Sequence, residues 1–170
     1  KAVNWLKKST KMTHEIIGLG DWLASAAGQR VQAWEQAPFE LALADVFGFH
    51  AIQLGLPQMH SLAASRMPHR WVLGNEADCL GDQWPLGVSA WADPAALPFP
   101  DASIDLVVLP HTLELCADPH GVLREVERVL VPEGRVVMTL FNPISLWGGR
   151  QARAHLCRRL GITSWGTLFL

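Results

Sequence analysis

Two polar residues follow apolar segments at positions where an open α/β sheet would bind a ligand. Asp93 comes directly after the apolar segment 88–92, and His111 follows the β-branched segment 104–109. Open α/β sheets bind their ligands at the carboxyl ends of the strands. His111 is therefore a candidate ligand contact or general base, with an ordinary polar neighbour as the alternative. For Asp93, which precedes a proline, the alternative is the cap of a turn.

The spacing of histidines and cysteines does not indicate a metal site or a disulfide. His111, Cys116 and His120 are separated by a predicted loop, and their spacing is not typical of zinc ligands. The three cysteines of the chain are odd in number and contain no CxxC pair. We therefore expect no metal, and free thiols in a reducing compartment.

The segment 93–142 has a strand–helix–strand pattern that predicts a parallel sheet. Apart from Asp105, Arg135 and Thr139, segments 104–109 and 135–141 are apolar, and both contain paired valines, as expected of buried parallel strands. Apolar residues recur at helical spacing over 119–130, with a charged face opposite, which predicts an amphipathic helix. The Pro-Glu-Gly sequence at 132–134 is expected to end this helix and turn the chain into the next strand.

The order of motifs over about residues 90–143 resembles that of the class I S-adenosylmethionine-dependent methyltransferases, especially those acting on small molecules. This family has an acidic residue, Leu-Pro-Phe beginning four positions later, a short Asp-containing turn and a strand that opens with Asp. A helix with an apolar stripe, a Pro-x-Gly turn and a final apolar strand follow. The corresponding residues here are Asp93, Leu97-Pro98-Phe99, Asp101, Asp105 and Pro132-Glu133-Gly134.

The resemblance implies an α/β fold, a Rossmann-like open and mainly parallel sheet with strand order 3-2-1-4-5 and helices on both faces. It also implies S-adenosylmethionine as the cofactor and a small molecule as the substrate. Residues 51–170 would form this methyltransferase core. The predicted strands are 51–54, 70–73, 88–92, 104–109 and 135–141.

The cofactor loop that the resemblance implies after the first strand is degenerate. The family has an acidic residue there, followed by glycines two, four and six positions later. This chain has Gln53, Gly55, Pro57 and Met59 at those positions, so only the first glycine is retained. Glycine allows close approach of the backbone to a ligand, whereas proline lacks an N–H and methionine adds bulk. We expect Gln53, Gly55 and Pro57 to border a cofactor that binds more weakly than in a typical member.

The resemblance assigns further cofactor contacts to the other strand ends. Glu76, or Asn75 beside it, would accept hydrogen bonds from the ribose hydroxyls, with a surface turn as the alternative. Asp93 would accept a hydrogen bond from the adenine amino group, and the N–H of Ala95 would donate to a ring nitrogen. His111 completes the predicted set. Methyl transfer depends mostly on proximity and orientation, so no catalytic dyad is expected to be conspicuous.

Residues 12–50 are expected to form two N-terminal helices, one over 21–35 and a second opened by Pro38. In the family such helices cover the cofactor or shape the substrate entrance, and packing on the sheet alone is the alternative. A further short helix is predicted over 61–66, behind the cofactor loop.

Both ends of the chain differ from the rest. All four lysines fall within residues 1–11 and the other ten basic residues are arginines, so 1–11 is expected to be an appended or flexible tail rather than a native basic one. The family closes its sheet with two further strands, and the 28 residues after Asn142 leave little room for them. We therefore expect the final strands to be missing and the core to be incomplete at its C-terminus. A fifth strand with an open edge would favour a homodimer.

Composition restricts the function further. The 170 residues are 49% apolar and 18% charged with a net charge of −2, which is typical of an ordered globular protein and gives no reason to expect a nucleic-acid partner. No apolar run approaches the roughly 20 residues that span a bilayer. The resulting hypothesis is a cytoplasmic S-adenosylmethionine-dependent methyltransferase. The alternative is a non-catalytic methyltransferase-like domain that binds a partner or another ligand, because the glycine loop is degraded.

Overall fold

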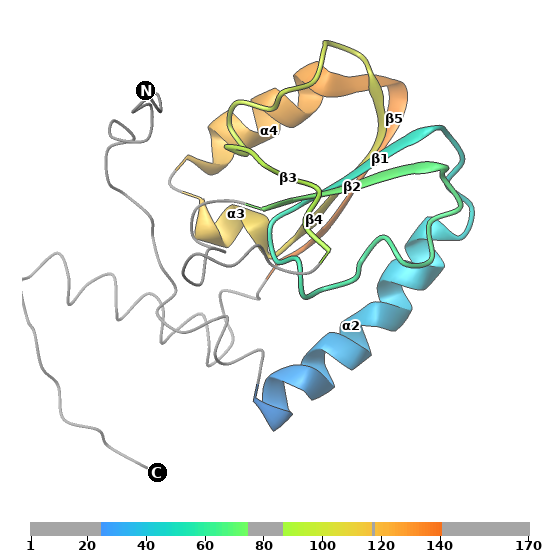
Figure 1. Cartoon of the computed structure of the whole chain (residues 1–170), viewed down its shortest axis with the longest axis vertical. Coiled ribbons are helices and arrows are strands. Elements are labelled where there is room, and N and C mark those ends of the chain that lie inside the picture. Colours follow the sequence, from blue (N-terminus) through green and yellow to red (C-terminus); the bar gives the residue numbers. More distant parts are fainter. Residues whose placement is uncertain (1–24, 75–86, 117, 141–170) are drawn as a thin grey trace, which may run out of the picture. The chain divides into compact units, whose positions relative to one another are not determined.

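A computed structural model describes residues 25–74, 87–116 and 118–140 (Figure 1). Within them, five strands form one sheet in the order β3-β2-β1-β4-β5, and all four neighbouring pairs are parallel. The predicted fold class and strand order are confirmed. The strands are β1 (His50–Leu54), β2 (His69–Gly74), β3 (Ala90–Trp91), β4 (Ile104–Pro110) and β5 (Leu130–Thr139).

Three helices accompany this sheet: α2 (Ala26–Leu43), α3 (Thr112–Leu115) and α4 (Pro119–Val129). The long helices α2 and α4 lie on opposite faces of the sheet (Figure 1). None of the helices in the described ranges is long and apolar enough to cross a membrane. The chain from Leu140 onward forms a separate unit, of which the structure describes only Leu140 itself.

The core lies between α4 and the centre of the sheet. β4 is buried along almost its whole length because β1 and β5 flank it and helices cover the sheet, which explains why its sequence is almost entirely apolar. Asp105 is the exception, since its carboxylate accepts hydrogen bonds from the N–H groups of Phe49 and His50 at 3.0 and 2.9 Å. This aspartate therefore fixes the beginning of β1 against β4.

Helix α4 agrees with the prediction at its start and ends one residue early. Asp118 is the N-cap and accepts a hydrogen bond from the Gly121 N–H at 2.9 Å, with a proline in the first turn. Three residues of the predicted apolar face, Val122, Val126 and Val129, are buried.

The turn predicted at Pro132-Glu133-Gly134 is wrong, because β5 already begins at Leu130 and these residues form an irregularity within it. Ile104 pairs with Leu130 but Leu106 pairs with Arg135, so several extra residues must be accommodated on β5. Glu133 takes a positive φ of 69° there. A Cβ on Gly134 would lie 2.9 Å from the carbonyl oxygen of Val131, which explains why glycine follows.

The two helical predictions upstream are corrected. One continuous helix, α2, replaces the predicted helices over 21–35 and from Pro38 onward, and Pro38 lies inside it. The buried side chains of Phe39 and Leu43 fix the part of α2 after the proline. The segment 61–66 is not a helix but a series of turns, closed by hydrogen bonds between residues three apart. Residues 12–24 lie outside the described ranges.

The buried position of β4 generates a stability prediction. Leu109 is 0% exposed and Leu41, on α2, is 81% exposed. Leu109→Ala is expected to lower the free energy of unfolding by about 2–5 kcal/mol, because it removes buried methyl groups and leaves a cavity. Leu41→Ala, the same change on the surface, should stay within about 0.5 kcal/mol of the wild type. Urea unfolding followed by circular dichroism measures both, and equal effects would contradict the described core.

Candidate functional site

The candidate site lies where the strand order reverses, between the carboxyl ends of β1 and β4. Connections leave these two adjacent strands in opposite directions, which opens a crevice in α/β sheets of this type. Thr112, directly after His111, donates a hydrogen bond from its hydroxyl to the carbonyl of Leu54, the last residue of β1. The ends of the two strands are thereby held together.

His111 occupies this position with a side chain that is almost completely buried. It caps α3 in a left-handed conformation with φ of 49°, which turns the chain sharply after β4. Its Nε2 lies 2.9 Å from Oε1 of Glu35, which α2 contributes. His111, predicted to contact a ligand at the carboxyl edge of the sheet, therefore contacts a carboxylate of the protein itself.

Sequence reasoning missed Glu35, although a signal for it existed. Glu35, Phe39 and Leu43 are spaced four residues apart on α2, so the glutamate shares a helix face with the two large buried side chains. A charged residue on a buried face is costly unless it has a partner. Such a glutamate is a reason to look for a partner elsewhere in the fold, and His111 is that partner.

The loop after β1 is built around the side chain of Gln53. This residue is 0% exposed, and its Nε2 donates to the carbonyls of Gly55, Leu56 and Met59 at 3.2, 3.0 and 2.7 Å. Gly55 and Leu56 have positive φ values of 74° and 43°, which bring these carbonyls round to the amide. An aspartate or glutamate at this position has no hydrogen to donate, so the glutamine and this loop conformation belong together.

The other predicted residues of the loop point inward. Pro57 is buried, and the Met59 side chain is only 4% exposed, so neither projects from the loop into solvent. The Gly55 N–H donates to the carbonyl of Leu73 at 2.8 Å. The backbone groups of this loop are therefore largely engaged within the protein.

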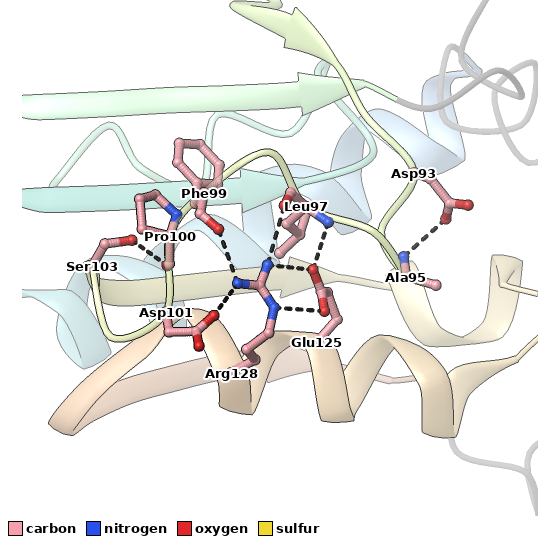
Figure 2. A network of polar contacts seen from close by, with 9 residues as sticks. All are labelled: Asp93, Ala95, Leu97, Phe99, Pro100, Asp101, Ser103, Glu125 and Arg128. Carbon is pink, nitrogen blue, oxygen red and sulfur yellow. Dashed lines mark hydrogen bonds and ion pairs between the residues drawn. The ribbon is translucent and has the colours of Figure 1, made fainter.

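The predicted adenine contacts, Asp93 and Ala95, form a turn with each other. The Ala95 N–H donates to Oδ1 of Asp93 at 2.9 Å, and both residues are exposed (Figure 2). This is the geometry of the turn cap that was the alternative for Asp93. The turn follows β3, so it lies on the same edge of the parallel sheet as Gly55 and His111. Glu76 and Asn75 lie outside the described residues.

A network around Arg128 fixes the segment that follows this turn, as Figure 2 shows. The guanidinium donates to both carboxylate oxygens of Glu125, at 3.0 and 2.6 Å, and to Asp101. It also donates to the carbonyls of Phe99 and Leu97, at 3.0 and 3.2 Å. The Leu97 N–H donates to Glu125 at 2.8 Å. Glu125 and Arg128 thus anchor the Leu-Pro-Phe motif and Asp101 to α4.

The network shifts the ionisation of its members. The hydrogen bond from Arg128 lowers the pKa of the Glu125 carboxyl, with the Leu97 N–H acting in the same direction and partial burial opposing both. The bonds to Glu125 and Asp101 raise the pKa of Arg128 above its ordinary range. From the sequence, Glu125 and Arg128 were assigned only to the polar face of the helix. The missed signal was their three-residue spacing, which allows an acidic and a basic side chain to meet on one helix face.

Metal chemistry finds no support in the described part of the chain. Among residues 25–74, 87–116 and 118–140, no three histidine, cysteine, aspartate or glutamate side chains gather in a group that could hold a metal ion.

Comparison with known proteins agrees with this architecture. Residues 80–138 match the methyltransferase domain family. The Escherichia coli protein YafS, which is uncharacterized, is 38% identical over 106 residues, covering 62% of this chain and 41% of YafS. A malonyl-[acyl-carrier protein] O-methyltransferase from Halorhodospira halophila is 42% identical over 72 residues, covering 38% of this chain and 24% of that protein. The matches thus span less than half of these relatives.

A solved structure gives the same result. The chain is similar to one from a complex between the Haloferax volcanii Trm112 methyltransferase activator and its candidate methyltransferase. The TM-score is 0.54 at 25% identity, covering 71% of this chain and 57% of the other. Together with the domain match, these relatives support the class I S-adenosylmethionine-dependent methyltransferase family for this chain, as the sequence predicted.

The Arg128 network generates a prediction with a pH dependence. Arg128→Gln is expected to lower the free energy of unfolding at pH 7, because Glu125 loses two charge-assisted hydrogen bonds. Since the pKa of Glu125 is lowered in the folded state, its contribution is fully present above the unfolded pKa, about 4.3, and is lost as the pH falls through the folded pKa. Urea unfolding at several pH values should show the difference from wild type shrinking in acid.

The matched control is Arg124→Gln on the same helix. Arg124 lies 3.6 Å from Asp118, and both side chains are mostly exposed, so this pair should contribute little at any pH. Equal losses in the two variants would contradict a special role for Arg128.

The Gln53 loop generates a second prediction. Gln53→Glu removes the amide hydrogens and places a buried carboxylate against three carbonyl oxygens. We expect a loss of stability of about 1–3 kcal/mol or more, because leaving buried polar groups unsatisfied has that cost and a charge increases it. Gln58→Glu, an exposed position in the same loop, is the control and should be close to neutral. Thermal unfolding compares them, and a stable Gln53→Glu variant would show that the amide does not organise the loop.

Proposed function

We propose that this chain is the cofactor-binding part of an S-adenosylmethionine-dependent methyltransferase. The observation that carries the proposal is the reversal of strand order between β1 and β4, with the buried pair His111 and Glu35 at the carboxyl ends of these strands. This is where α/β sheets of this order bind nucleotide-like ligands. The methyltransferase domain match, which spans β3 to most of β5, supports the same conclusion.

The residues at this edge suit the cofactor in part. S-adenosylmethionine carries hydroxyl and amino donors together with a cationic sulfonium, and when bound it supplies a methyl group on an electron-poor sulfur. Glu35 offers a buried carboxylate oxygen, Oε2, to which no described residue donates. Asp93 offers an exposed carboxylate after β3, and the Ala95 N–H beside it is a donor of the right kind for an adenine ring. The loop after β1 contributes least to such a site, because three of its carbonyls are hydrogen-bonded to the Gln53 amide.

The role of these residues is to bind and orient rather than to react. His111 is held by Glu35 on one side of its ring and by the sharp turn after β4, so its position is well defined. Asp93 and Ala95 would exchange their mutual hydrogen bond for bonds to the ligand. Such positioning is the main contribution a protein makes to methyl transfer.

The proposal also covers the methyl acceptor, the location and the oligomeric state. We also propose a small molecule as the methyl acceptor, which the resemblance to the family suggests, and the cytoplasm as the location. Within the described sheet β5 is the last strand, so a homodimer formed through its outer edge stays a prediction.

A second candidate function is a methyltransferase-like domain without catalytic activity, which binds a partner or another ligand. The Gln53 loop favours it, because three carbonyls that a bound cofactor would border are directed at the amide instead.

Binding measurements separate these two functions. S-adenosylmethionine and S-adenosylhomocysteine are expected to raise the unfolding temperature of the chain, whereas NAD should not, because no dinucleotide motif follows β1. A ligand at a hundred times its dissociation constant stabilises by about 2.7 kcal/mol. Asp93→Ala should weaken binding by the equivalent of one hydrogen bond, about 0.5–1.5 kcal/mol. The Asp101→Ala variant, which changes the Arg128 network instead, is the control. No stabilisation by either adenosyl ligand would favour the non-catalytic function.

A further inference from the structure

We propose that Glu35 is the counter-ion for a cationic group of the ligand that binds where the strand order reverses, and that His111 holds its carboxylate in place. The inference rests on the proposed function, which supplies a ligand at this edge of the sheet. It adds a binding residue from α2, an element outside the matched methyltransferase domain.

The burial of Glu35 is the first observation. The residue is 8% exposed, and it is the only acidic residue among the buried ones in the described part of the chain. Oε1 contacts His111 at 2.9 Å, while Oε2 is shielded from solvent and receives no hydrogen bond from a described residue. A buried carboxylate with one oxygen unsatisfied is expensive, and a bound cation or donor would remove that cost.

The position of the carboxylate is the second observation. His111 comes directly after β4, and its neighbour Thr112 is bonded to the last residue of β1. Glu35 therefore reaches the carboxyl ends of the two strands between which the order reverses. The carboxylate thus lies at the edge of the sheet where the family's ligand is expected, and α2 contributes it.

The third observation is that the acidic residue that the family has at the end of β1 is replaced by Gln53 in this chain. Gln53 stands where the resemblance expects an acid, and its amide is engaged with its own loop. Residue 53 therefore brings no negative charge to the end of β1. The cofactor carries two cationic groups, the sulfonium and the ammonium of its methionine part, and Glu35 supplies the buried negative charge that complements one of them.

The helix that carries Glu35 contains a proline three residues after the glutamate. Pro38 lies inside α2 and has no N–H to donate to the carbonyl of Trp34, so the helix lacks one hydrogen bond at this point. Of the buried residues of α2, Phe39 and Leu43 come after the proline, and Gly28 and Glu35 come before it.

Calorimetric titration of the whole chain tests the inference. Wild type, Glu35→Gln and Glu40→Gln are titrated with S-adenosylmethionine and with S-adenosylhomocysteine, which lacks the sulfonium charge. Glu40 is an exposed residue on the same helix and provides the matched control. Glu35→Gln should weaken binding by about tenfold or more, since a hydrogen bond to a charged group contributes about 1.5–3 kcal/mol. Loss for both ligands assigns the ammonium to Glu35, and loss for S-adenosylmethionine alone assigns the sulfonium.

The outcomes distinguish this inference from the proposed function. Equal affinities of wild type and Glu35→Gln would overturn the role of Glu35 and leave the cofactor assignment intact. A wild type that binds neither ligand would overturn both. If Glu35→Gln does not fold, 5′-methylthioadenosine replaces it as the test, because this neutral compound lacks both cationic groups. Wild type should then bind it at least about tenfold more weakly than S-adenosylmethionine, which carries both groups, and equal affinity would overturn the inference.

Discussion

The burial of β4 between β1 and β5 is the constraint on which the rest of the structure depends. A parallel strand covered on both faces can carry almost no polar side chains, so any chemistry it supports must lie at its ends. Asp105 meets this condition at the beginning of β4, and His111 with Thr112 meets it at the end. The same strand thereby aligns the beginning of β1 and joins the carboxyl ends of β1 and β4.

Hydrogen bonds from α4 anchor the irregular stretch between β3 and β4. The stretch between β3 and β4 has no partner strand for its carbonyls, and Arg128 reaches two of them from α4. Because the guanidinium is a planar fork with five donors, it serves Glu125, Asp101 and the backbone together. The turn of Asp93 and Ala95 is thus attached to a segment that is itself held in place.

Much of the fold was predictable because it depends on patterns with a short range. Continuous apolar runs identified β1, β4 and β5, and helical spacing identified α4, since burial imposes these patterns directly. The errors arose where local signals conflict with tertiary packing. Pro38 signals a helix start, yet the packing of Phe39 and Leu43 keeps α2 continuous. The Pro-Glu-Gly sequence signals a turn, yet pairing with β4 begins before it.

The site was less predictable because its members come from distant parts of the chain. His111 was identified from its position after a strand, whereas Glu35 lies 76 residues away and only the fold brings it close. The resemblance to a family placed Gln53 at the position of an acidic residue, which does not indicate what the glutamine contacts. Its actual partners are carbonyls of the loop that follows it, and no spacing rule indicates that a side chain will bond to these later residues.

The arrangement around Gln53 also restricts how this loop can change over evolutionary time. An acidic residue alone would place a charge against three carbonyls, and a glycine at position 59 alone would empty the space that Met59 fills. Each single substitution is therefore expected to destabilise the loop. Residue 53 and the loop that it bonds can only be exchanged together.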